Sequence, residues 1–156
     1  MARRKRAEVR KIVKDPKYGS ELISKFMNSL MLDGKKSVAE KTLYKALENI
    51  KGVKSETIPN TFEQIIELAK PLMEVKSRRV GGSNYQVPTS VRPARAQALS
   101  IRWIIDSSRK RPEKTMADRL AKEFSDILAG QGSTLKKKSD VQKMADANKV
   151  YSQYNW

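Results

Sequence analysis

The pattern in this sequence that most clearly indicates a binding function is a row of arginines on one face of a predicted helix. Arg95, Arg102 and Arg109 are spaced by seven residues, and because a helix drifts only ~20° per heptad, they form one continuous stripe. Planar guanidinium groups match the geometry of phosphate oxygens. Asp106 is the only acid between residues 75 and 112, so we predict phosphate binding rather than an ordinary solvated face of mixed charge. The residues that flank or extend this stripe are Arg92, Lys110 and Arg111.

A second pattern is an arginine-rich segment around two glycines. Gly81 and Gly82 can both take positive φ, which favours a two-residue β-hairpin turn with strands within about residues 73–89. Neither face of this ribbon is apolar enough for a core, and a lone ribbon is only marginally stable in water. We therefore expect it to project and to find its partner, a polyanion, elsewhere. The predicted cross-strand pairs are Lys76 with Val87, Arg78 with Tyr85, and Arg79 with Asn84.

Basic runs elsewhere provide further candidate phosphate ligands. Lys35 and Lys36 lie beside the start of a helix that Ser37 and Glu40 are predicted to open as a capping box, and anions favour that position. Residues 1–17 have a like-charge run and no hydrophobic period, which predicts a disordered arm that orders on a partner. Phosphate binding and simple solvation fit the lysines of the last helix equally well. The candidates in these runs are Arg3, Arg4, Lys5, Arg6, Arg10, Lys35, Lys36, Lys136 and Lys137.

The charge balance supports a nucleic-acid partner. The 156 residues include 33 Lys and Arg against 17 Asp and Glu, a net charge of +16. The excess lies in residues 1–17 and 70–111, whereas residues 18–69 are balanced. Such asymmetry is typical of proteins that bind nucleic acid.

Residue types that are absent limit the other function classes. The sequence has no His and no Cys, which excludes imidazole and thiolate catalysis and Cys/His metal sites. The carboxylates are scattered rather than clustered. No apolar run approaches ~18 residues, so we predict no membrane partner. We expect no enzymatic activity, no metal, no cofactor and no small-molecule substrate.

Hydrophobic spacing predicts the scaffold that would hold these residues. Apolar positions at intervals of three and four predict helices over about 20–31, 37–51, 58–69, 92–111, 115–129 and from 133 into the 140s. The expected fold is mainly α, a bundle of about six helices with one projecting two-stranded antiparallel β-ribbon between the third and fourth helices. The expected organisation is a basic arm at 1–17, a single helical RNA-binding domain at 18–150, and an aromatic tail at 151–156. The sequence leaves open whether Tyr151, Tyr154 and Trp156 pack or stack on bases.

Several of these segments, taken together and in order, resemble the bacterial form of the family of the seventh small-subunit ribosomal protein. The resemblance covers essentially the whole chain, and the ordered set of segments is highly specific. The segments are Asp-Gly-Lys-Lys-Ser at 33–37, Val-Lys-Ser-Arg-Arg-Val-Gly-Gly at 75–82, Tyr-Gln-Val-Pro at 85–88, Val-Arg-Pro-Ala-Arg at 91–95, Ile-Arg-Trp at 101–103, Ser-Arg-Lys-Arg at 108–111, Glu-Lys-Thr-Met-Ala at 113–117 and Lys-Met-Ala-Asp-Ala-Asn-Lys at 143–149.

The resemblance implies a structural role in the cytoplasmic small ribosomal subunit. It implies binding to the 3′ domain of small-subunit rRNA, nucleation of head assembly, and a place at the exit site beside tRNA and mRNA. Neighbouring small-subunit ribosomal proteins are implied partners, and repression of the protein's own mRNA stays open. The residues implied at the exit-site contact are Arg78, Arg79, Gly81, Gly82, Tyr85 and Lys149.

Two other function classes rank below this interpretation. A helical DNA-binding regulator would need a recognition helix and usually a two-fold dimer, and no sequence feature demands either. An RNA-modifying enzyme ranks third because the chain lacks His, Cys and clustered carboxylates. Co-sedimentation with ribosomal particles would separate the ribosomal protein from the regulator.

Overall fold

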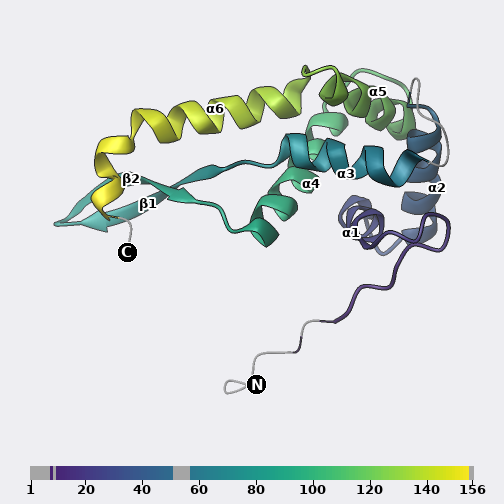
Figure 1. The fold of residues 1–156 in the computed structure, drawn as a ribbon, viewed down its shortest axis with the longest axis horizontal. Coiled ribbons are helices and arrows are strands. Elements are labelled where there is room, and N and C mark those ends of the chain that lie inside the picture. The colour runs from purple at the N-terminus through teal and green to yellow at the C-terminus, as the bar shows by residue number, and fades with distance from the viewer. Residues whose placement is uncertain (1–7, 9, 51–56, 155–156) are drawn as a thin grey trace.

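The predicted fold class is confirmed by the computed structural model, which describes residues 8, 10–50 and 57–154. Six α-helices, one short 3-10 helix and one antiparallel hairpin make up this part of the chain, and the hairpin points away from the helical bundle (Figure 1). The elements are α1 (Glu21–Leu30), α2 (Lys36–Glu48), α3 (Ile58–Ala69), β1 (Met73–Val80), β2 (Ser83–Ser90), α4 (Pro93–Arg109), α5 (Met116–Leu128), α6 (Ser133–Ala147) and η2 (Lys149–Tyr154).

Three phenylalanines hold the centre of the bundle together. Phe26 of α1, Phe62 of α3 and Phe124 of α5 are all fully buried. Their ring centroids lie 5.4 to 5.9 Å apart with steep interplanar angles, an arrangement that favours contact between ring edges and faces. Ile104 of α4 is buried in the same core cluster. This core fixes the positions of α1 and α4, which carry the residues discussed below.

Two predicted helix starts are confirmed and one is wrong. The Ser20 hydroxyl accepts a hydrogen bond from the Ile23 N–H, and Thr115 accepts one from Asp118. Ser37, in contrast, lies inside α2, which has Lys35 at its N-cap and no side-chain cap. The reason is the preceding turn at residues 33–34, where both backbones have positive φ and the Lys35 N–H reaches back to the Leu32 carbonyl at 2.9 Å. This turn starts the helix before Ser37 can act as a cap.

The register of the hairpin is confirmed at every predicted pair, with Lys76 opposite Val87, Arg78 opposite Tyr85, and Arg79 opposite Asn84. Gly81 and Gly82 have φ of 57° and 88°, as their two-residue turn requires.

The expectation that the ribbon finds no partner within the domain is wrong. Helix α6 runs alongside it, and η2 packs against β2 (Figure 1). Val87 is fully buried, and the Tyr85 ring lies 5.2 Å from that of Tyr151 and 5.5 Å from that of Tyr154. We call these three rings the tyrosine clamp. It shows that residues 151–154 pack on the domain on the face of the ribbon that carries Tyr85, whereas Arg79, on the opposite face, is exposed.

The segment expected to be an arm is attached to the helices at its end. Asp15 is 2% exposed. Its carboxylate accepts hydrogen bonds from the Tyr44 hydroxyl at 2.6 Å and from the Tyr18 N–H at 2.8 Å. Burial, together with this carboxylate, raises the pKa of Tyr44. Arg10 is exposed. The candidates Arg3, Arg4, Lys5 and Arg6 lie outside the described residues.

Replacing Tyr85 with alanine is expected to loosen the ribbon without unfolding the bundle. The substitution removes two ring contacts, which together contribute about 2 kcal/mol. Amide hydrogen exchange should therefore show roughly 30-fold less protection in β1, β2 and η2, with unchanged protection in α3 and α5. Asn84→Ala, on the exposed face of the same strand, is the control. Unchanged protection of the ribbon in Tyr85→Ala would show that the clamp does not hold it.

Candidate nucleic-acid interface

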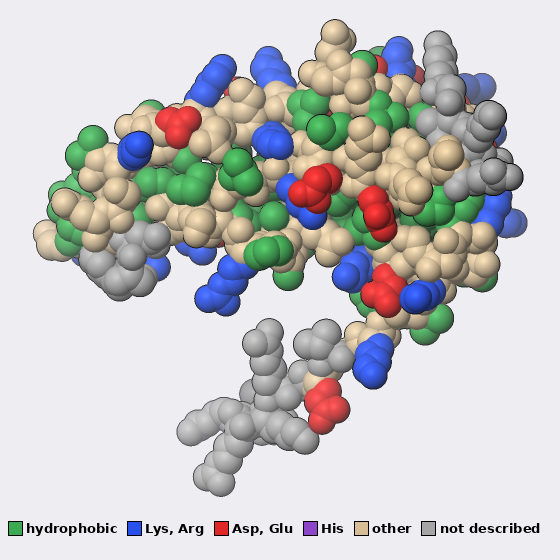
Figure 2. Space-filling model, viewed as in Figure 1, with side chains coloured by type: hydrophobic (Ala, Val, Ile, Leu, Met, Phe, Trp, Pro, Cys, Tyr) green, Lys and Arg blue, Asp and Glu red, His purple; other side chains and the backbone are tan. Residues whose placement is uncertain are grey.

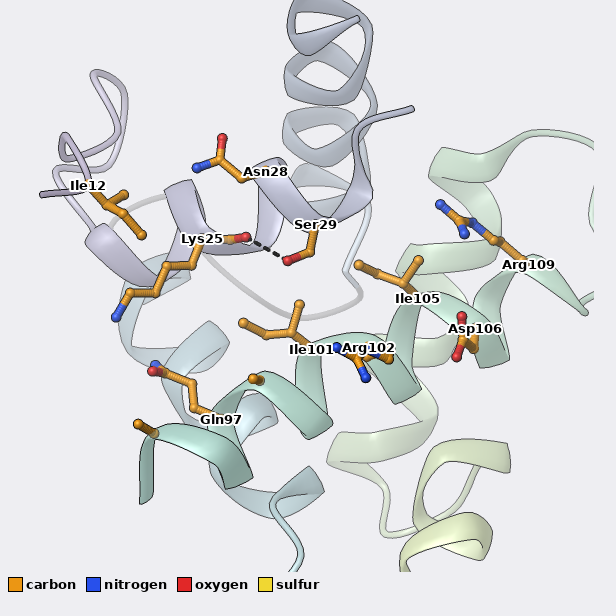
Figure 3. Close-up of a pocket in the computed structure, with 12 residues that line it drawn as sticks. Ile12, Lys25, Asn28, Ser29, Gln97, Ile101, Arg102, Ile105, Asp106 and Arg109 are labelled. Carbon is orange, nitrogen blue, oxygen red and sulfur yellow. Dashed lines mark hydrogen bonds between the residues drawn. The ribbon is translucent and has the colours of Figure 1, made fainter. Parts of the chain in front are cut away.

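The central part of the predicted stripe lines a groove between α1 and α4. Arg102 and Arg109 are exposed along one wall of this groove, which has a volume of about 600 Å³. Lys25 of α1 lines it from the other side (Figure 3). Packing of α1 on α4 thus adds a third cation to the two arginines. We call this depression the α1–α4 groove.

A second basic depression lies between α4 and α6, with a volume of about 420 Å³. Lys110, Lys136 and Lys137 line it together with Asp106. The Lys137 ammonium lies 5.4 Å from the centroid of the Trp103 ring, an attractive cation–π distance. The lysines that begin α6 are therefore brought next to the end of the arginine stripe.

The Lys35 side chain borders a third depression, of about 510 Å³, beside the turn between α1 and α2. Arg109 lines this depression as well as the α1–α4 groove. The Lys35 ammonium lies 3.9 Å from the Asp33 carboxylate, and Lys36 is exposed. The three depressions therefore adjoin one another around the C-terminal half of α4.

Arg111 occupies a different environment from the rest of the stripe. Its side chain is only 15% exposed, and NH1 lies 2.6 Å from Glu123 and 2.9 Å from Asp126. A third carboxylate, that of Glu113, lies 3.3 Å from Nε. Burial alone would lower the pKa of Arg111, but these carboxylates outweigh it and raise that pKa. Arg111 therefore belongs to an internal ion cluster rather than to the exposed stripe.

Arg95 and Lys76 are both paired with one carboxylate. Arg95 Nε lies 2.7 Å from Glu74 and the Lys76 ammonium lies 2.9 Å from it. Burial opposes ionisation of Glu74, but the hydrogen bonds from Lys76 and Arg95 prevail and lower its pKa. Both cations remain about half exposed. The pair links β1 to the first turns of α4, where Arg92 is the exposed N-cap.

The residues implied at the exit-site contact gather around the ribbon. Gly81 and Gly82 are exposed at its tip, and Lys149 is exposed at the start of η2, which packs on β2. Arg79 is exposed on the open face, whereas Arg78 is half-buried on the braced face. Tyr85 is held in the tyrosine clamp, so its ring already has two stacking partners within the chain.

Sequence patterns missed several residues that line these depressions. Lys25 and Asn28 lie on the polar side of α1, which hydrophobic spacing describes only as facing solvent. Gln97 lines the same groove from α4. Arg119 lines the third depression, and its Nε donates to the Glu113 carbonyl at 2.6 Å. Only the packing of α1 and α5 against α4 brings these residues together.

The surface is basic without being uniformly so. Acidic and basic side chains are mixed over α1 and α3 on the face shown in Figure 2. In the α1–α4 groove, by contrast, Asp106 is the only acid among the lining residues that the structure describes. Within the described ranges, no group of three or more Asp or Glu side chains is arranged to hold a metal ion. None of the helices there is long and apolar enough to cross a membrane.

The chain forms a mainly helical domain with a braced ribbon and with adjoining depressions that Lys and Arg side chains line. A profile of the family described as Ribosomal protein S7p/S5e matches residues 2–149. The chain therefore belongs to the ribosomal protein S7 family, whose members are structural, non-enzymatic proteins of the small ribosomal subunit.

Full-length relatives agree with this assignment. The chain is 53% identical over 157 residues to a protein named small ribosomal subunit protein uS7 from Paracoccus denitrificans (strain Pd 1222), with all of both chains covered. Proteins with the same name from Sulfurimonas denitrificans (strain ATCC 33889 / DSM 1251) and Sulfurovum sp. (strain NBC37-1) are each 52% identical over 154 residues, covering 99% of both chains.

Proposed function

We propose that this protein binds the 3′ domain of small-subunit rRNA, nucleates assembly of the head, and places its ribbon at the exit site near tRNA and mRNA. The observation that carries the proposal is the group of three adjoining depressions around α4, which Arg109 and Asp106 connect. A cation that borders two depressions, as Arg109 does, suits a point where RNA helices converge, because each helix brings its own phosphates. Neighbouring proteins of the small subunit are the further partners in this proposal.

The ribbon's contribution follows from which of its faces is open. Arg79 on the open face of the ribbon and Lys149 at the start of η2, which packs against β2, are the exposed cations that we assign to tRNA or mRNA. Tyr85 acts through the clamp by orienting the ribbon, so we assign it a positioning role and no base stacking. In this proposal the helical grooves hold rRNA, and the ribbon acts later, in the assembled particle.

The test compares RNA domains with the full-length protein at one salt concentration. We expect a transcript of the 3′ domain of small-subunit rRNA to bind at least about a hundredfold more tightly than a transcript of the 5′ domain, the kind of ratio that separates specific from non-specific binding. Chemical footprinting should show protection confined to the 3′ domain. Equal affinity for the two transcripts would mean that the basic surface binds RNA without selecting a site, which would refute the proposal.

A further inference from the structure

We propose that the α1–α4 groove binds the ribose edge of a base-paired RNA helix, with the Asp106 carboxylate accepting a hydrogen bond from a 2′-hydroxyl group. This inference rests on the proposed RNA-binding function. It specifies which feature of the RNA this groove recognises, namely the sugar as well as the phosphate.

The position of the acid is the first argument. Asp106 lies four residues after Arg102 and three before Arg109 on α4, so the arginines bracket it at about 6 and 4.5 Å along the helix axis. It lines both the α1–α4 groove and the depression next to α6. A carboxylate at this position would repel a phosphate. It would therefore weaken a site that bound phosphates alone. A hydroxyl group, however, can donate a hydrogen bond to it.

The state of the Asp106 carboxylate supports the same partner. Asp106 is half-buried. Within the described part of the chain, it forms no ion pair with either neighbouring arginine and no side-chain hydrogen bond. Its oxygens are therefore left to accept a hydrogen bond from an occupant of either depression that Asp106 lines, the α1–α4 groove or the one next to α6. In an RNA backbone, phosphates alternate with riboses. The order arginine, aspartate, arginine along α4 matches this alternation, with each arginine facing a phosphate and the aspartate facing a ribose hydroxyl.

The other polar residues of the groove suit the same partner. Asn28 and Ser29 of α1 and Gln97 of α4 line the groove, and the Ser29 hydroxyl donates a hydrogen bond to the Lys25 carbonyl at 3.1 Å (Figure 3). Carboxamides and hydroxyls both donate and accept hydrogen bonds, and so does the 2′-hydroxyl that distinguishes RNA from DNA. If the partner were a phosphate, the carbonyl oxygen of each carboxamide would have no donor to bond with, because an ionised phosphate only accepts hydrogen bonds.

The shape of the groove favours a paired helix over a single strand. Ala94 and Ala98 are exposed where α4 forms its wall, so the wall carries short side chains at these two positions, where a ribose edge can approach the helix. No aromatic residue is among its described lining, whereas recognition of splayed single-stranded bases relies on aromatic stacking. A-form RNA displays its 2′-hydroxyls along a wide, shallow minor groove. The side chains that α1 and α4 contribute to the α1–α4 groove can reach hydroxyls presented in this way.

The experiment uses the full-length protein and three labelled probes at one salt concentration. The probes are a blunt RNA duplex, the DNA duplex of the same sequence, and one unpaired RNA strand. The variants are Asp106→Ala, Asp106→Asn and the control Asp146→Ala, because Asp146 is an exposed acid that lines none of the three depressions. Thermal unfolding verifies that each variant is folded.

We expect the wild type to prefer the RNA duplex over the DNA duplex by about tenfold, the effect of one hydrogen bond to a charged group. Asp106→Ala should remove most of this preference, chiefly by binding DNA more tightly. Asp106→Asn keeps an acceptor without the charge and should lie between. Asp146→Ala should keep the preference.

The alternative outcomes separate this inference from the function it rests on. If Asp106→Ala tightens binding of both duplexes by the same factor, Asp106 is only a nearby charge and the inference is wrong, while RNA binding stands. If the unpaired strand binds as tightly as the RNA duplex, the groove holds single strands and the inference again fails. If the wild type binds none of the probes and no 3′-domain transcript, the proposed function itself is refuted.

Discussion

Glu123→Ala is expected to lower the free energy of unfolding by about 3–5 kcal/mol, the usual cost of removing one partner from a buried ion pair. Glu123 is fully buried. It accepts hydrogen bonds from Arg111 NH1 at 2.6 Å, from the Thr134 N–H at 3.0 Å and from the Thr134 hydroxyl at 2.7 Å. One side chain of α5 thereby holds both the segment after α4 and the first turn of α6, which has no side-chain cap of its own.

Thermal unfolding monitored by circular dichroism measures this effect. For a chain of this size, the loss corresponds to a fall in Tm of about 10 °C. Glu63→Ala, at an exposed position of α3, is the matched control and should change Tm by about 1 °C or less. Glu123→Gln keeps the shape and some hydrogen bonds and should fall in between. A variant Glu123→Ala as stable as the control would show that the ion cluster does not hold α6 in place.

The second large effect is expected in RNA binding when Arg102 and Arg109 are both changed to glutamine. Both side chains are exposed along the α1–α4 groove. Each lost phosphate contact should reduce the slope of log K against log salt by roughly 0.7–0.9. The double variant should therefore lose about 1.4–1.8 from the slope and, at low salt, about a hundredfold in affinity for the 3′-domain transcript.

Filter-binding titrations over a range of salt concentrations give both quantities. The matched control is Lys41→Gln with Lys45→Gln, which removes the same charge from exposed positions of α2 that line none of the three depressions. Equal losses in the two double variants would mean that only total charge matters. That result would contradict the assignment of the groove as the binding surface.

Features of this fold that depend on nearby residues could be predicted from the sequence. The hairpin register followed from Gly81 and Gly82 alone, because a two-residue turn fixes the pairing of every residue beyond it. The bounds of α3, Ile58–Ala69, followed from hydrophobic spacing and from Pro71, since both act within a turn or two.

Features that depend on distant residues could not be predicted in this way. Arg111 continued the basic stripe in the sequence, but its partner Glu123 lies on another helix and lacks any local pattern. Lys25 became a groove residue only through the packing of α1 on α4. Tyr85 looked exposed because its partners Tyr151 and Tyr154 come about 66 residues later. In each of these cases the contact depends on a side chain that is distant in the sequence.

The tyrosine clamp also has a consequence for the time course of synthesis. Tyr85 leaves the peptidyl-transferase centre about 66 residues before Tyr151, which at 5–20 residues per second is roughly 3 to 13 s earlier. During that interval the hairpin has its turn but neither ring of its brace, and a two-stranded ribbon alone is only marginally stable. A nascent chain interrupted before residue 151 would keep the buried phenylalanines of its bundle and α6 beside the ribbon, but it would lack both rings that pack on Tyr85. The ribbon therefore gains the last of its bracing contacts only after Tyr151 and Tyr154 have been made.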